Sequence, residues 1–301
     1  MASTRTVRSR YRLLMSTNQT VCRKLIGNEL RHAREQKGVN QDEAADHIGA
    51  KVSKISRLEL GQTRVSMAEV KMLLEFYGHD PEHFDGLLTL ARGANQRGRW
   101  DGHRASIQDW FRMYVDLEAG AEEIRWVQAE LMPGVLQSEG YARAVHAEAL
   151  AAARDPQVIE NRIQERLERQ RPLLDGDAPV SFVLSESCLR REVGGAEVMR
   201  TQLTHLLELA QLRSVQIQVL PFSATTYVGG ASYGFTLLTL GAPGIASPLD
   251  IVYVEDYHDA SYIDDNEVVR SYANQWRRMT AAALGPAESM DFIREVAAHH
   301  K

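Results

Sequence analysis

The sequence predicts an α+β fold, in which an all-α five-helix domain precedes a larger mixed α+β domain. Between residues 19 and 90, apolar residues recur at helical spacing and a glycine follows most of the runs. From residue 180 onwards, short β-branched or alternating runs lie between helical segments. The 301 residues are also enough for two domains with separate cores.

The helix boundaries of the first domain, residues 19–90, are well marked. Two capping boxes are expected, because Asn40 precedes Glu43 and Ser66 precedes Glu69 by three residues. Glycines stand where left-handed residues commonly end helices: Gly38, Gly49, Gly61 and Gly78. Residues 1–18 lack a convincing apolar face and are expected to be a flexible basic leader, a DNA-grazing arm, or sequence upstream of a true start at Met15.

The third helix, expected over 51–60, has small and basic side chains on one face and apolar Ile55 and Leu58 on the other. A tight turn at Gly49 joins it to the helix before it. Two short helices joined in this way are typical of a helix-turn-helix, whose second helix lies in the DNA major groove.

Each outward-facing residue of this helix suits a contact with DNA. Arg57 has the planar fork that reads guanine O6 and N7, Ser53 can donate or accept a hydrogen bond, and Val52 can pack on a thymine methyl. Lys51 and Lys54 can neutralise phosphates. The plainer interpretation is a helical hairpin with a solvated basic face, or one that contacts protein only.

Residues 25–90 resemble the Xre/Cro-type helix-turn-helix domain of phage repressors and many bacterial regulators. The matching residues are Arg34, Asn40, Gln41, Ala45, Ile48, Gly49, Ile55, Ser56, Arg57, Leu58, Glu59 and Gly61. The resemblance implies that Gln41 helps to clamp the phosphate backbone and that an Arg34–Glu59 ion pair supports the recognition helix. It also implies that Val52, Ser53 and Arg57 face base edges.

The candidate DNA contacts are therefore Gln41, Lys51, Val52, Ser53, Lys54, Ser56 and Arg57. Lys51 departs from the family, which often has Ser or Thr as the N-cap at this position. The helix is then capped differently, or Lys51 contacts a phosphate.

The charge distribution supports a DNA partner, although the whole chain has a net charge of −5. Residues 1–64 carry 13 Lys/Arg and 6 Asp/Glu, which leaves 22 Lys/Arg and 34 Asp/Glu for residues 65–301. A basic N-terminal part followed by an acidic remainder is typical of a DNA-binding domain joined to a domain with a different partner.

Cysteine usage and hydropathy predict a cytoplasmic, nucleoid-associated protein. Cys22 and Cys188 are too few and too isolated for a disulfide framework or a metal knuckle. No apolar run reaches 18 residues, so we expect no membrane span, and the N-terminus has no adequate hydrophobic core for a secretion signal.

A linker is predicted over 91–105, where three glycines and four arginines show little periodicity. The second domain, 106–301, should begin with helices and a short strand near Ile124. Further strands are expected at four places, and helices near 199–212, after Asp264 and from Pro286. The strand segments are 180–184, 215–220, 234–240 and 251–254.

Residues 106–284 resemble the uncharacterised domain that follows the helix-turn-helix in actinomycete, antitoxin-like regulators of the Xre type. The matching segments include 131–143, 166–171, 184–195, 215–221 and 252–255. The resemblance implies a DNA-binding regulator, often encoded beside a small partner protein that it binds. It implies no defined chemistry for the domain itself.

Motifs for catalysis and for cofactors are weak in this chain, so we expect no enzyme, cofactor or metal. His79 and His83 are four residues apart, but they flank Asp80 and Pro81 at a helix start, where solvated groups are common. The tract 227–234 is the candidate ligand or partner site, since its glycines would let backbone approach a ligand; a simple hairpin explains it equally well. The candidate residues are Tyr227, Gly229, Gly230 and Tyr233.

These observations predict a homodimeric, sequence-specific transcriptional regulator that binds double-stranded DNA. The larger domain would dimerise and receive a signal from a small partner protein or a ligand, with the protein favoured by the antitoxin-like resemblance. The alternative is a C-terminal enzyme or small-molecule receptor with the helix-turn-helix as its targeting module.

Overall fold

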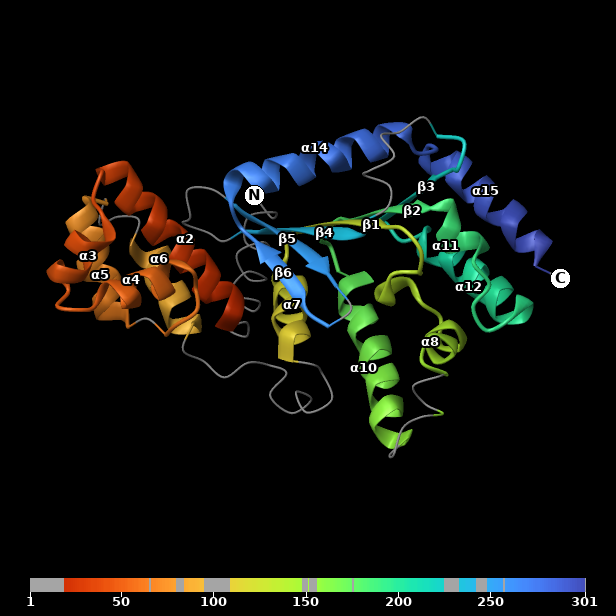
Figure 1. The fold of residues 1–301 in the computed structure, drawn as a ribbon, viewed down its shortest axis with the longest axis horizontal. Coiled ribbons are helices and arrows are strands. Elements are labelled where there is room, and N and C mark those ends of the chain that lie inside the picture. Colours follow the sequence, from red (N-terminus) through yellow and green to blue (C-terminus); the bar gives the residue numbers. More distant parts are fainter. Residues whose placement is uncertain are drawn as a thin grey trace, which may run out of the picture. The chain divides into compact units, whose positions relative to one another are not determined.

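The computed structural model describes residues 19–64, 66–79, 84–94, 109–147, 151, 156–174, 176–224, 233–241, 248–256 and 258–300. Two compact units result. The first contains the N-terminal helices together with a helix at 109–120, and the second contains most of a six-stranded sheet and the helices around it (Figure 1). The leader 1–18 and most of the predicted linker lie outside the described residues.

The five predicted N-terminal helices are all present. They are α2 (Gln19–Lys37), α3 (Gln41–His47), α4 (Val52–Glu59), α5 (Met67–Tyr77) and α6 (Phe84–Gly93). Both predicted capping boxes form, at Asn40 with Glu43 and at Ser66 with Glu69. The apolar sides of these helices share one core, which includes Leu25, Leu30, Ile55, Leu73, Leu74 and Leu87.

Helix α2 crosses α4 so closely that only glycine fits at the contact. A Cβ atom on Gly27 would lie 2.5 Å from the carbonyl oxygens of both Leu58 and Glu59. At the end of α4, Gly61 has φ +67° and faces the α2 backbone at Lys24. These two glycines therefore set the position of α4 against α2, since a side chain at either point would push the helices apart.

Helix α7 (Asp109–Gly120) packs with this unit. The Thr20 hydroxyl donates to the Asp116 carboxylate over 2.7 Å, and Gly120 lies against Val21 of α2. The sequence prediction assigns residues 106–120 to the second domain. In the structure, the contacts of Phe111–Ala121 group them with the N-terminal unit.

The second unit is built on a sheet with strand order β3-β2-β1-β4-β5-β6. The strands are β1 (Glu123–Gln128), β2 (Val180–Ser185), β3 (Val215–Leu220), β4 (Phe235–Leu240), β5 (Leu249–Glu255) and β6 (Ala260–Ile263). Strands β1, β2 and β3 run parallel, with Ile124 opposite Val180 and Val180 opposite Val215, whereas β5 and β6 are antiparallel.

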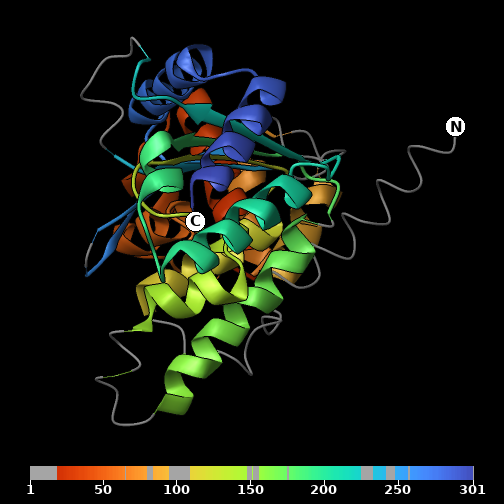
Figure 2. The same ribbon diagram turned by 90° about the vertical axis from the view of Figure 1, so that its right-hand side faces the viewer.

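The parallel strands require long crossover connections, which the helices supply. Between β1 and β2 come the short η2 turn (Gly134–Leu136), α8 (Glu139–Val145) and α10 (Pro156–Leu174), and between β2 and β3 come α11 (Glu186–Arg190) and α12 (Ala196–Leu209). Helix α14 (Asn266–Ala282) packs Trp276 and Met279 against Val127 and Val183 of the sheet. The crossover helices α8, α10 and α12 lie on the opposite side from α14 (Figures 1 and 2).

Helix α15 (Pro286–His299) seals the β3 edge of the sheet. The Ser289 hydroxyl accepts from the Val219 amide over 2.9 Å, and the Leu284 amide donates to the Val219 carbonyl over 2.9 Å. The side chain of Gln218 adds a bond to the Leu284 carbonyl. Hence the turn before α15 satisfies backbone groups that a strand would otherwise pair.

Two sequence expectations were wrong. Strand β6 was not predicted, because its four residues follow an acidic run that resembles a solvated loop. The N-cap of α14 is Asp265, whose carboxylate accepts from the amides of Glu267 and Val268. A capping-box pattern, in which the N-cap precedes Glu267 by three residues, would have made Asp264 the N-cap.

Gly27→Ala should destabilise the N-terminal unit by about 1–3 kcal/mol, since the added methyl overlaps two carbonyl oxygens that belong to backbone. Urea unfolding followed by circular dichroism would measure this. Gly140→Ala is the matched control, because it also lies in a helix but has its nearest neighbour at 3.9 Å. Equal stability of both variants would contradict the close contact between α2 and α4.

Candidate nucleic-acid interface

Helices α3 and α4 are joined by a turn whose geometry depends on Gly49. This residue has φ +64°, a left-handed conformation that side chains other than glycine adopt at a cost. Lys51 is the N-cap of α4, and its side chain makes no capping hydrogen bond, so the start of α4 leaves amides open toward solvent or a ligand. Lys51 therefore does not replace the capping hydrogen bond that a Ser or Thr side chain would make at this position.

Helix α4 separates its residues as the sequence predicts. Ile55 and Leu58 are buried in the domain core, together with Glu59. Lys51, Ser53 and Arg57 are exposed, and so is Val52 at 37 %. Gln41, Lys54 and Ser56 are half-buried at the edges of this exposed face.

A buried carboxylate holds α4 in place. Glu59 is 5 % exposed and accepts two hydrogen bonds from Arg34, at 2.6 Å from Nε and 3.0 Å from Nη2. Gln41 donates a third, 2.8 Å from its Nε2. Arg34 also donates to the Val39 carbonyl, so one guanidinium connects α2, the start of α3 and the end of α4.

The electrostatic effects of this cluster are consistent with a tight ion pair. The hydrogen bond to Glu59 raises the pKa of Arg34 above its usual value. Burial, and then the charge of Glu59, raise the pKa of Tyr77 to about 12. Arg34 therefore stays protonated, and Gln41 is left with its second amide hydrogen for an outside acceptor.

Besides Gln41, two further predicted contact residues have partners within the protein. Lys54 forms an ion pair with Glu69, the residue that completes the capping box of α5. The Arg57 side chain lies along its own helix, where Nε donates to the Ser53 carbonyl over 3.1 Å. Arg57 can be extended at little cost, because that bond is exposed, whereas Lys54 would have to leave a carboxylate.

The tract singled out as a ligand or partner site remains a prediction. Tyr227, Gly229 and Gly230 lie outside the described residues, and Tyr233 is 70 % exposed just before β4. Of the histidine pair His79 and His83, His83 also lies outside the described residues. Within the described part of the chain, no cluster of three or more His, Cys, Asp or Glu side chains could hold a metal ion.

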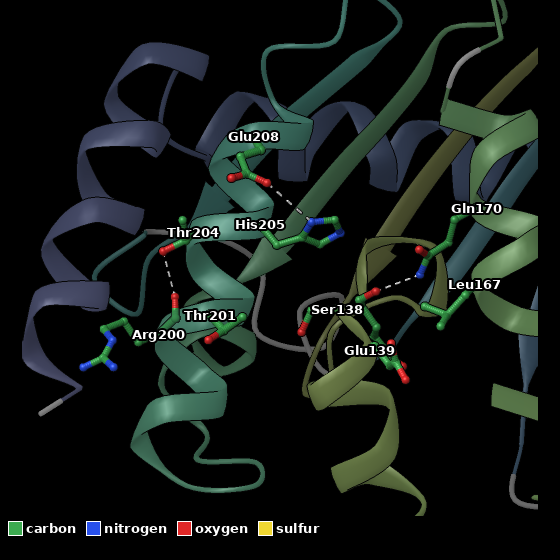
Figure 3. Close-up of a pocket in the computed structure, with 10 residues that line it drawn as sticks. Ser138, Glu139, Leu167, Gln170, Arg200, Thr201, Thr204, His205 and Glu208 are labelled. Carbon is green, nitrogen blue, oxygen red and sulfur yellow. Dashed lines mark hydrogen bonds and ion pairs between the residues drawn. The ribbon is translucent and has the colours of Figure 1, made fainter. Parts of the chain in front are cut away.

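A pocket in the second unit was not predicted. It has a volume of about 430 Å³ and lies between α12, α10 and the turn that leads into α8 (Figure 3). Its lining residues are Gln137, Ser138, Glu139, Leu167, Gln170, Arg200, Thr201, Thr204, His205 and Glu208. Only Leu167 among them is apolar. No sequence pattern could reveal it, because three separate elements contribute to its walls.

Three glutamines fix the wall of this cavity around the η2 turn. Gln170 donates to the carbonyls of Gly134 and Gln137, and Gln202 bonds both the Leu136 carbonyl and the Ser138 amide. Gln137 donates to the Met132 carbonyl and accepts from Arg166 over 2.6 Å. The irregular segment 132–138 is thus held by side chains from α10 and α12, which makes the cavity pre-formed.

His205 is the most distinctive group in the cavity. Figure 3 shows its ring extending from α12 toward the side on which Gln170 and Ser138 lie. Nδ1 lies 3.9 Å from Glu208, and Nε2 has no hydrogen-bond partner among the described residues. Burial lowers the pKa of His205, so the ring is neutral at pH 7 and Nε2 can donate or accept.

Both cysteines are buried, and neither is a candidate nucleophile. Burial raises the pKa of Cys22 and of Cys188 to about 12, so the thiolate form is scarce at neutral pH. No helix in the described part of the chain is long and apolar enough to cross a membrane.

Comparisons with known proteins identify both parts of the chain. A family described as a helix-turn-helix domain matches residues 25–87. A second family, described as a domain of unknown function (DUF5753), matches residues 111–295, and its match includes α7. No curated protein matches the chain. No solved structure matches it either.

Glu59→Ala should destabilise the N-terminal unit by about 3–5 kcal/mol, because the largely buried Arg34 guanidinium would lose its buried carboxylate partner. Glu35→Ala is the control: Glu35 also approaches Arg34, at 3.6 Å, but is 58 % exposed, so its loss should cost below about 1 kcal/mol. Urea unfolding would compare the free energies of unfolding of the two variants with that of the wild type. Similar losses would mean that the Glu59 cluster contributes no more than a surface pair.

Proposed function

The chain belongs to the DUF5753 family and carries a helix-turn-helix domain in front of that family's domain, and we propose that it is a sequence-specific, DNA-binding transcriptional regulator. The observation that carries this proposal is the exposed face of α4. Val52, Ser53 and Arg57 are presented to solvent on a helix that Glu59 and two glycine contacts hold rigidly. Exposure of an apolar residue beside a basic one suits base edges and thymine methyls.

The residues around this face would position the protein on the phosphate backbone. Gln41 is held by Glu59 and keeps a free amide hydrogen, and Lys51 stands at the open N-terminus of α4. Helix N-termini and lysines are both common phosphate ligands. Arg34 and Glu59 would act indirectly, by fixing the height and angle of α4.

We further propose that the regulator acts as a homodimer in the bacterial cytoplasm. Two α4 helices would enter successive major grooves about 34–36 Å apart on a pseudo-palindromic site.

The second unit would dimerise and receive the signal, and its antitoxin-like resemblance favours a small partner protein as that signal. No catalytic step is assigned to the chain. A signal changes DNA binding only if its ligand prefers one DNA-binding state over the other.

The cavity beside α12 favours a second candidate, a receptor for a small polar molecule. Its volume lies within the range of small-molecule sites, and its wall is pre-formed by Gln170 and Gln202. The hydroxyls of Thr201 and Thr204 donate to carbonyls of their own helix and so present lone pairs as acceptors. The charged lining residues are Glu139, Glu208 and Arg200, and Glu139 is paired with Arg143, so the lining selects neither an anion nor a cation by charge alone.

The decisive experiment measures binding of the full-length protein to its own upstream DNA and to random DNA of equal length, across a salt series. A regulator should bind its site in a tight, sequence-dependent complex with two protomers per site. Weak and strongly salt-dependent binding without preference would contradict sequence-specific recognition by the free protein.

Arg57→Ala is expected to weaken binding to the cognate site by about 1–3 kcal/mol and to relax the preference at one base position. Fluorescence anisotropy with single-base variants of the site measures both effects. Arg270→Ala on α14 removes the same charge from an exposed helix of the second unit and should change little. Equal weakening on all sequences would show that Arg57 contacts a phosphate instead of a base.

His205→Phe should abolish binding of any small molecule in the cavity while it keeps a ring of similar shape. Thermal shift and calorimetry with glucose, glucosamine, glucuronate and spermidine would cover neutral, cationic and anionic probes. A probe that stabilises the wild type but not His205→Phe supports the receptor candidate. If no probe shifts the wild type, or if the variant responds equally, these probes do not use this cavity.

A further inference from the structure

Glu69, in the first turn of α5, forms an ion pair with Lys54 of the recognition helix α4. Its Oε1 atom receives the Lys54 ammonium group, while its Oε2 atom accepts from the Ser66 amide and the Ser66 hydroxyl, each over 3.0 Å. The Glu69 amide in turn donates to the Ser66 hydroxyl. One carboxylate therefore caps α5 and also binds a lysine of α4.

Lys54 lies at the edge of the exposed face of α4. The helix places it between Arg57, which is exposed, and the buried residues Ile55 and Leu58. Its side chain is 37 % exposed and that of Glu69 is 23 % exposed, so the pair is accessible to a third group. A phosphate that flanks the groove would meet Lys54 at this edge, provided that the lysine is released.

Glu69 is well suited to hold this lysine in the absence of DNA. Burial by itself would raise the pKa of Glu69, but the hydrogen bonds from Lys54 and Ser66 outweigh it and lower the pKa. The carboxylate is therefore charged at neutral pH and is fixed by its capping bonds, so it does not have to be ordered to bind Lys54. A carboxylate and a phosphate oxygen are equivalent acceptors for an ammonium group.

We propose that Glu69 is an internal competitor for DNA phosphate, which holds Lys54 on the protein and suppresses binding to DNA of random sequence. On a correct site, base contacts by Arg57 and Ser53 hold a phosphate close to Lys54 and favour its transfer from Glu69. On random DNA those contacts are missing and the transfer is unfavourable. Glu69 thus contributes to specificity without touching DNA. This inference rests on the proposed function.

The test is Glu69→Gln in the full-length protein. Glutamine at this position is compatible with a capping box, so the fold should be preserved, and an unchanged melting temperature would verify this. Affinity for random DNA should rise about three- to tenfold near 0.1 M salt, because one ion-pair competitor is removed. The slope of log K against log salt should steepen by about 0.9, the contribution of one newly engaged phosphate.

Two controls separate this mechanism from a general charge effect. Glu75→Gln lies on the same helix, makes the same charge change and frees Lys71 from an exposed pair at 3.7 Å, and it should leave the slope unchanged. In a Lys54→Ala background, Glu69→Gln should give no steeper slope and little gain in affinity. If Glu69→Gln weakens the cap, Glu69→Asp keeps the charge but shortens the reach to Lys54 and should give the same direction of change.

The outcomes distinguish this inference from the proposed function. A steeper slope that requires Lys54, together with a smaller ratio of specific to random binding, supports it. If the wild type binds DNA but Glu69→Gln leaves its slope unchanged, or the gain persists without Lys54, the competitor role is overturned while the regulator remains. If no variant binds DNA at low salt, both proposals fall.

Discussion

The buried Glu59 carboxylate is the interaction on which the DNA-facing part of the molecule depends. It joins three helices by accepting from Arg34 and Gln41, and it lies at the end of α4, where the Gly27 contact brings the α2 backbone against the same turn. A charged group in this position is stable only when every lone pair is satisfied. The position of the recognition helix is therefore fixed by directional hydrogen bonds, which tolerate few geometries. Apolar packing of Ile55 and Leu58 alone would allow a wider range of helix positions.

The second unit uses the same physical device with neutral groups. Segment 132–138 has almost no regular structure, yet its buried backbone groups are satisfied by Gln137, Gln170 and Gln202. Side-chain amides can replace a strand or helix partner because each offers donors and an acceptor. In both units, then, the place where a ligand is proposed to bind lies beside irregular backbone that long side chains hold in position.

Much of the N-terminal unit could be predicted from the sequence, because its signals are local. Asn40, Ser66 and the glycines at helix ends each mark a boundary within one turn, and Ile55 and Leu58 mark the buried face of α4. Five of the six described strands of the second unit were also recognised from β-branched or alternating runs. The Lys54–Glu69 pair and the cavity at His205 were not foreseen, since they join residues on different elements whose distance in space no local pattern encodes. Strand β6 was missed for a related reason, because it is four residues long and forms by pairing with β5.

The closure of the β3 edge has a consequence for self-association. An unpaired strand edge is a template for the same strand of another molecule. Here the edge is covered by the Leu284 turn and by Ser289, both supplied by the last helix pair in the chain. The final helix and the turn before it therefore prevent the β3 edge from pairing with the same strand of another molecule. A chain that has not yet completed α15, on the ribosome or after proteolysis before Ser289, exposes Val219 to its neighbours even though the rest of its sheet is already present.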